Sequence, residues 1–203
     1  MPSQRIGPGT TTALCKVLLE VPTIRLLDLH ENVLRDRGVS TLVDTFITIS
    51  ENNKRAIAKQ EVRNTLERME NLYSQDDILS PTSSGSLTDH KCNITFLNLG
   101  SNDIGRKGIE YLSEWLTHES CQLKTLILGS EKNGLYGNKI DSECASLLAV
   151  SLRRNQSLTA LDLNRCEDIG KKDQKAFIDF ANTFDLSGKG ISAYIDEQKE
   201  QHE

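Results

Sequence analysis

The sequence lacks the features of membrane proteins, nucleic-acid binders and disulfide-rich secreted proteins. No apolar run approaches the roughly 20 residues that span a bilayer, and a net charge of −5 over 203 residues argues against the basic face of a nucleic-acid binder. The five cysteines are odd in number and contain no Cys-x-x-Cys pair. The N-terminus has neither a long apolar core nor a clear cleavage site. A reduced, cytoplasmic protein fits these absences best.

Motifs of catalysis are missing as well. The chain has no Gly-x-Ser-x-Gly, no His-Glu-x-x-His, and only four histidines in unrelated positions. We therefore expect no enzymatic activity and no cofactor. The pairs His90-x-Cys92 and His118-x-x-Cys121 occupy equivalent places and could in principle converge on Zn²⁺. The alternative is two small cysteines buried at a repeat junction, with exposed histidines nearby, and we expect no metal.

One stretch, Phe96–Gly108, reads as strand, glycine-rich turn and helix, which is the order of a phosphate-binding loop. A Walker A loop needs Lys and then Ser or Thr directly after its second glycine. Here Gly105 is followed by Arg-Lys-Gly, so the lysine is displaced and the hydroxyl is missing. A second copy of the stretch carries His30 and Arg35 where this one has Gly100 and Gly105. The glycines are therefore interpreted as a strand-to-helix turn.

The chain repeats itself. The segment from Ile94, ITFLNLGSNDIGRKGIEYLSEWL, aligns with IRLLDLHENVLRDRGVSTLVDTF from Ile24. Further copies start at Leu123, with seven extra residues, and at Leu158, and partial copies occupy 1–23 and 181–195. We expect one domain over 1–203. The first alignment matches eight positions: Ile24/Ile94, Leu27/Leu97, Leu29/Leu99, Asn32/Asn102, Leu34/Ile104, Gly38/Gly108, Leu42/Leu112 and Phe46/Leu116.

Each copy has two halves with different periodicities. The Leu-x-Leu segment has the period of a strand with one buried face, and the second half places apolar residues four apart, as on one side of a helix. A strand and a helix repeated every 28 or so residues predict a solenoid. The pattern resembles leucine-rich repeats of the ribonuclease-inhibitor type. That resemblance implies an α/β leucine-rich-repeat solenoid, with parallel strands on the concave face, helices on the convex face, and turn-binding ladder residues at Asn32, Asn102, Asn138 and Cys166.

The residues between and beside the two leucines of each strand should face outward on the concave surface. Three acids, Asp28, Asp162 and Asp185, would share one column beside an apolar patch. Such a surface would suit a basic, amphipathic segment of a partner protein; the alternative is that it is merely solvated. The candidate partner-binding residues are Leu26, Asp28, His30, Phe96, Asn98, Ile127, Asp162, Asn164 and Asp185.

About 42 residues, roughly 51–92, interrupt the repeat that starts at Ile24. Their second half is rich in turn and linker residues, and we expect it to be disordered. The first half predicts a helix. That helix either packs on or extends the preceding convex helix, or docks on a partner through apolar residues at helical spacing, namely Ile57, Val62, Leu66, Met69 and Tyr73.

These features predict a non-catalytic scaffold for protein–protein interaction. By analogy with repeats of this type, it could be a subunit of a larger cytoskeletal or ciliary assembly. The alternative is a regulator of a small GTPase, since Ran GTPase-activating protein has similar repeats. The chain begins within a repeat, so we also consider that another chain covers the N-terminal edge around Leu27 and Leu29.

Overall fold

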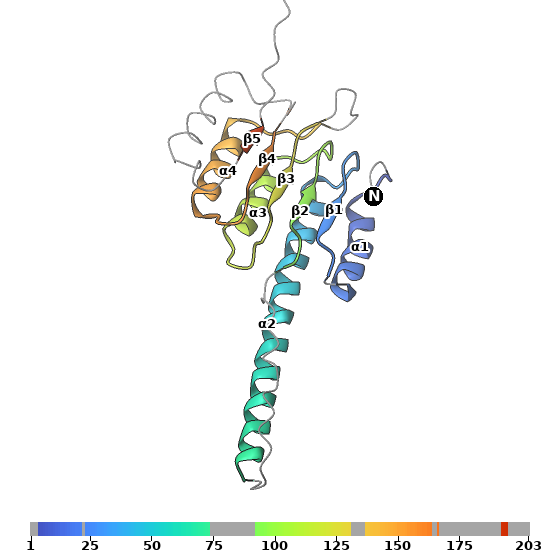
Figure 1. Ribbon diagram of the computed structural model, residues 1–203. Helices are drawn as coiled ribbons and strands as arrows, with labels where there is room; N and C mark the ends of the chain where they lie inside the picture. Colours follow the sequence, from blue (N-terminus) through green and yellow to red (C-terminus); the bar gives the residue numbers. More distant parts are fainter. Residues whose placement is uncertain are drawn as a thin grey trace, which may run out of the picture.

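The computed structural model describes residues 4–21, 23–73, 92–130, 137–163, 166 and 192–194. Strands and helices alternate along most of the chain (Figure 1). None of the helices in these ranges is long and apolar enough to cross a membrane. The elements are α1 (Pro8–Glu20), β1 (Leu26–Asp28), α2 (Arg35–Tyr73), β2 (Phe96–Asn98), α3 (Arg106–Thr117), β3 (Thr125–Ile127), α4 (Ser142–Arg154), β4 (Ala160–Asp162) and β5 (Ser192–Tyr194).

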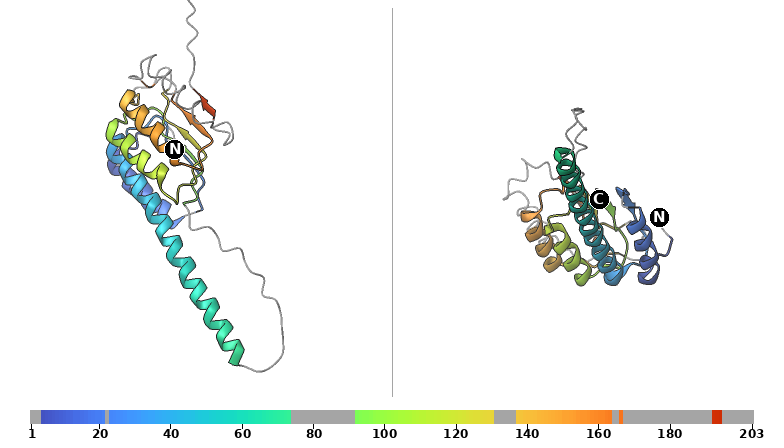
Figure 2. Two further views of the ribbon diagram at one scale, coloured as in Figure 1. Left: turned by 90° about the vertical axis from the view of Figure 1, so that its left-hand side faces the viewer. Right: turned by 90° about the horizontal axis from the view of Figure 1, so that it is seen from below.

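The strands form one parallel sheet in the order β1-β2-β3-β4-β5. Leu27, Leu97, Leu126 and Leu161 are in register across its first four strands. The helices α1 to α4 stack side by side on one face of this sheet (Figure 2). The predicted α/β leucine-rich-repeat solenoid is confirmed.

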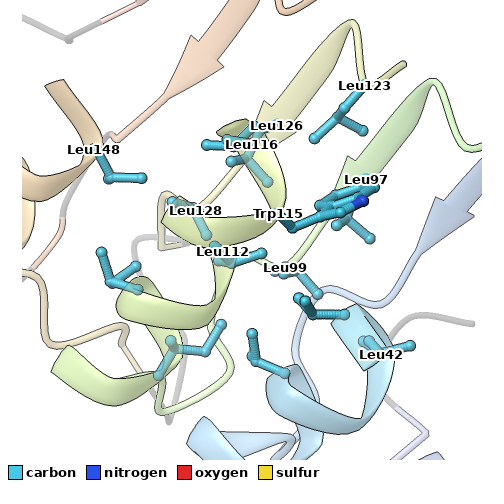
Figure 3. Close-up of a cluster of buried hydrophobic side chains, with 14 of the residues drawn as sticks. Leu42, Leu97, Leu99, Leu112, Trp115, Leu116, Leu123, Leu126, Leu128 and Leu148 are labelled. Carbon is cyan, nitrogen blue, oxygen red and sulfur yellow. The ribbon is translucent and has the colours of Figure 1, made fainter. Parts of the chain in front are cut away.

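The core lies between the sheet and the helices, as Figure 3 shows for leucines from both layers. The segments of β1 to β4 each contribute two leucines, and the helices contribute apolar residues three or four positions apart. The largest side chain, Trp115 of α3, is fully buried and lies with its ring centroid 4.6 Å from that of Phe46 in α2. This aromatic contact packs one repeat against the next.

Buried asparagines connect the turns that follow the strands. Asn102 donates from Nδ2 to the carbonyl oxygens of Gly100 and Leu29, at 2.9 Å each, and accepts from the Leu34 amide. Asn138 repeats this pattern one turn further, accepting at 3.0 Å from the Asn102 and Ile104 amides.

The same pattern continues at both ends of this ladder. Asn32 donates to the carbonyl oxygens of Leu29 and His30 and accepts from the amides of Gln4 and Ile6. At the other end, the Cys166 thiol lies 3.7 Å from the Leu128 carbonyl oxygen. All four residues expected as ladder residues are buried, and each therefore satisfies backbone groups that water does not reach.

We expect Asn102→Ala to lower the free energy of unfolding by about 3 kcal/mol, because it leaves buried carbonyl and amide groups without partners. Urea denaturation measures the change. Asn52→Ala, on the exposed side of α2, is the control and should change stability by less than about 0.5 kcal/mol. Equal effects of the two substitutions would contradict the role of the ladder.

The inserted segment continues the convex helix. α2 runs without interruption from Arg35 to Tyr73, three times the length of α3 or α4, and its second half extends away from the repeats as an arm (Figures 1 and 2). The expected linker that follows, 74–91, lies outside the described residues. Of the two alternatives for the helix, extension of the preceding convex helix is the arrangement observed.

Two sequence expectations differ from the structure. Ile57 was assigned to one apolar stripe with Val62, but five residues of helix rotate it about 140° away, and it is half-buried whereas Val62 is 61% exposed. The alignment of the terminal partial repeat places Asp185 in one column with Asp162, whereas Tyr194 pairs with Asp162 in the sheet.

Candidate interaction surface

The face of the sheet away from the helices carries the outward residues in straight columns. Asp28, Asn98, Ile127 and Asp162 are paired in register across four strands, and all four are half-buried. The neighbouring column is Leu26, Phe96, Thr125 and Ala160, with Leu26 63% exposed. The register therefore brings these candidate residues together on one surface.

Two further candidate residues, Asn164 and Asp185, fall outside the described residues. The position beside Asp162 in the sheet belongs to Tyr194, so the column of three acids expected from the alignment contains two acids in the described strands, Asp28 and Asp162.

Asp28 already has a structural partner in His30. Its Oδ1 lies 2.8 Å from His30 Nδ1 and accepts from the His30 backbone amide at 3.2 Å. Burial alone would raise the pKa of the Asp28 carboxyl, but these hydrogen bonds outweigh burial, and the pKa is lowered. In the next repeat, Asn98 Oδ1 likewise accepts a hydrogen bond from the backbone amide two residues on, that of Gly100, at 3.0 Å. Asp28 and Asn98 thus fix the ends of their strands as well as lining the surface.

Gly100 is explained by the neighbouring repeat. A Cβ atom at this position would lie 2.4 Å from the carbonyl oxygen of Gly129, in the turn after β3. Because that oxygen is a backbone atom, it cannot move aside as the end of a flexible side chain could. The close approach of consecutive turns requires glycine here.

The glycine-rich turn before α3 binds a carboxylate of the chain itself. Oδ1 of Asp36, in the first turn of α2, accepts from the amides of Gly105 at 2.7 Å and Gly108 at 3.0 Å. Gly105 is the N-cap of α3 and has no side chain to cap it. In the equivalent position of α4, the N-cap Asp141 accepts from the Cys144 amide at 2.8 Å. Asp36 therefore supplies across the repeat boundary the cap that Asp141 supplies locally.

We expect Asp36→Ala to destabilise the protein by about 1–2 kcal/mol, since two amides at the start of α3 lose their acceptor. Asp36→Asn should restore most of the loss because its amide oxygen still accepts. Asp44→Ala, an exposed position on the same helix, serves as the control. If the alanine and asparagine variants unfolded at the same urea concentration, the cap would not be the reason for the effect.

The cysteines have the properties of core residues. All five are free and buried. Burial raises the pKa of Cys92 and Cys144 to about 11 and that of Cys166 to about 12, and it also raises those of Cys15 and Cys121. These thiols are therefore protonated at neutral pH and poor nucleophiles.

The zinc hypothesis finds no support in the described ranges. They contain no group of three or more His, Cys, Asp or Glu side chains that could hold a metal ion, and His90 lies outside them. The His118 ring is engaged instead with the Ser120 hydroxyl, with 2.7 Å between Nδ1 and Oγ.

At pH 8 we expect no more than about one thiol per folded chain to react with a disulfide reagent within minutes, because the raised pKa values leave little thiolate. All five should react after unfolding in denaturant. Absorbance of the released reagent measures the number of reacted thiols, and mass spectrometry identifies them. Rapid modification of Cys92 or Cys121 in the folded protein would contradict this account.

Comparison with known proteins identifies the repeats. A family profile described as Leucine Rich repeat matches residues 90–113 and 154–177. Over 189 residues, 82% of this chain, the sequence is 29% identical to mouse "NACHT, LRR and PYD domains-containing protein 14", of which it covers 18%. It is 41% identical over 78 residues, 37% of this chain, to mouse "NACHT, LRR and PYD domains-containing protein 4E", of which it covers 7%. The chain thus spans less than a fifth of either relative, and the profile matches agree with the leucine-rich-repeat solenoid fold of the structure.

Sequence reasoning missed two structural residues. Asp36 comes directly after the turn that follows β1 and lies in the first turn of α2. The only sign of its role in the sequence is an acid at the start of one helix, while the next helix, α3, has glycine at its N-cap. Asp28 carried a clearer signal, because Asp-x-His and Asn-x-Gly end equivalent strands and both can form a side-chain-to-backbone turn.

Proposed function

We propose that this leucine-rich-repeat protein is a non-catalytic scaffold that binds a partner protein on the concave face of its sheet. The observation that carries the proposal is the register. Short parallel strands align outward side chains in columns, and solenoids of this kind use such extended surfaces for binding. Within the described residues, no helix covers this face, because α1 to α4 all lie on the other side.

The composition of the columns supports a partner segment that is both apolar and basic. Leu26, Phe96 and Ile127 offer apolar area at the surface, and Asp28 and Asp162 stand at either side of Asn98 and Ile127. Apolar contacts would supply affinity, while the acids would select the sign of the partner's charge and speed its association. Ile127 and Asp162 are paired in register in neighbouring strands, so substituting both alters one continuous part of this surface.

A second surface supports assembly with a further unit at the N-terminal end of the array. Thr45, Trp115 and Ser151 occupy equivalent positions in α2, α3 and α4, on the side of each helix that faces the helix before it. All three are buried, at 7%, 0% and 4% exposure. The equivalent residue of α1, Val17, is 50% exposed. Leu26, in the edge strand β1, is 63% exposed. A strand and helix of another repeat would cover both, as part of a larger assembly.

The double substitution Ile127→Lys/Asp162→Lys should weaken binding of an extended peptide of alternating Lys and Leu by at least about tenfold, through charge repulsion and lost apolar contact. Fluorescence anisotropy of the labelled peptide at fixed salt measures the dissociation constant. The matched control, Glu114→Lys/Val150→Lys, adds the same charge on exposed convex positions and should leave binding within about twofold.

An alternating Glu–Leu peptide tests the sign of the charge. Equal binding of the acidic and basic peptides to the unaltered protein would contradict the charge argument. Equal weakening by the concave and convex double variants would move the binding site away from the concave face.

A further inference from the structure

A polar cavity lies between the loops that follow α3 and α4. Its volume is about 480 Å³, which is in the range of sites for small ligands. Because the strands are parallel, these helix-to-strand loops lie at the edge of the sheet opposite to the turns that carry the ladder asparagines. None of the described candidate residues of the concave face lines the cavity, so it is a separate feature of the molecule.

A buried asparagine fixes the walls of the cavity. Asn155, the C-cap residue of α4, donates from Nδ2 to the carbonyl oxygen of Leu116 at 2.7 Å, which ties its loop to the end of α3. Its Oδ1 accepts from the backbone amides of Ser157 at 2.9 Å and Leu158 at 2.6 Å. The two loops are therefore held in place before any ligand binds, and binding does not have to order them.

His118, the C-cap residue of α3, also lines the cavity and supplies a hydrogen-bond donor. Its Nδ1 accepts from the backbone amide of Ser120 at 3.2 Å, two residues on, as Asn155 Oδ1 does from Ser157. A ring nitrogen that accepts a hydrogen bond carries no proton, so the proton of the neutral ring is on Nε2. Within the described residues, no acceptor is bonded to this Nε2–H.

Two cations make the cavity positive. Lys124, directly before β3, and Arg154, at the end of α4, line it and form no ion pair with any described residue. The one acid in the lining, Glu119, is paired with Lys54 of α2. The C-terminal ends of α3 and α4 contribute about half a negative charge each, which the two full positive charges exceed. The cavity is thus positive although the chain has a net charge of −5.

We propose that this cavity binds a phosphate monoester. The phosphate of a monoester carries about −1.5 to −2 charges at neutral pH, which the two cations offset, whereas a carboxylate would leave one cation uncompensated. The guanidinium of Arg154 donates in a fork that fits two phosphate oxygens, and Lys124 and the Nε2–H of His118 supply further donors. Both cations are exposed, so water and salt weaken each contact, and the expected dissociation constant is about 1 mM.

Titration of the full ¹⁵N-labelled chain with methyl phosphate, at pH 7.5 and constant ionic strength, tests the proposal. The amide signals of 117–124 and 154–158 should shift together with one dissociation constant. Lys124→Gln/Arg154→Gln should raise that constant at least about tenfold, because two charged donors are lost. The matched control, Lys16→Gln/Lys107→Gln, removes the same charge at exposed positions outside the cavity and should leave the constant within about twofold.

The substitution His118→Asn tests the ring nitrogen separately. Asparagine at this C-cap keeps an acceptor for the Ser120 amide, as Asn155 does for the Ser157 amide after α4, but it has no Nε2–H. The variant should therefore unfold at nearly the same urea concentration as the unaltered protein and bind methyl phosphate about threefold more weakly. Unchanged binding would remove His118 from the site.

Acetate, with a single charge, should bind at least about fivefold more weakly than methyl phosphate. Equal binding of these two anions, equal effects of the two double variants, or no saturable shift up to about 50 mM methyl phosphate would overturn the proposal. None of these substitutions alters the concave columns, so the outcome is independent of the proposed function.

A capped phosphoserine distinguishes two sources of the phosphate. Binding that is tighter than that of methyl phosphate, and absent for the capped serine without phosphate, supports the site and assigns it to a phosphorylated side chain of a partner protein. Equal binding of the two monoesters supports the site for a small phosphorylated molecule. Binding of the unphosphorylated serine as tightly as the phosphoserine overturns the proposal.

Discussion

The structure depends on backbone groups that are buried in consecutive turns and must be hydrogen bonded. Each repeat closes its strand with a turn that lies against the turn before it, and the stacking removes the carbonyls and amides from water. A fully buried asparagine serves both, because its amide nitrogen donates to carbonyls of two successive repeats while its oxygen accepts from amides of the preceding turn. No residue with only a donor or only an acceptor does this. The position of Asn102 and Asn138 therefore fixes the register of the sheet, and the register fixes the outward columns.

Close stacking of the turns also explains their composition. Gly100 lies against the backbone of the next turn, and Gly108 lies against Ile104 and the carboxylate of Asp36. A Cβ at either position would meet an atom at less than 3 Å. Arg35 and Lys139, from the turns on either side, both pair with Asp103 and link three consecutive turns at the surface. These pairs are largely exposed on the basic side and add little to stability. The tight backbone contacts, rather than the charges, determine the geometry.

Much of the fold could be predicted from sequence because its determinants recur. Leu97 and Leu99, Asn102 and Gly108 each have counterparts at a fixed spacing, and a pattern repeated several times identifies both the buried face and the register. The arm was predicted as a helix, and its continuity with α2 was one of the alternatives left open. The sequence could not decide between them, because continuity is marked only by the absence of a capping residue between the two parts. Asp36 could not be assigned because its partners lie about 70 residues away, across the insertion. Ile57 was misplaced because apolar residues were grouped by rough spacing instead of by angle around the helix.

The end of the chain illustrates the limit of repeat reasoning. The alignment of the terminal partial copy rested on few matches, and Ser192–Tyr194 rather than the aligned segment stands beside β4. The assignment of Asp185 to the concave surface rested on the same few matches. The strand register follows the alignment where the leucines are spaced as in the neighbouring copies, from Leu27 to Leu163.

Because α2 runs as one helix from the core into the arm, it sets a fixed distance and direction between the repeats and the tip of the arm. Phe46, in its packed part, is held against Trp115 of the next repeat, while its last residue, Tyr73, lies about 35 Å from Ser50 at the helical rise. A protein held at the tip would therefore sit at a set distance and direction from anything held in the concave sheet. Adding or deleting residues in the arm would change both, since each residue lengthens the helix by about 1.5 Å and rotates its tip by about 100°.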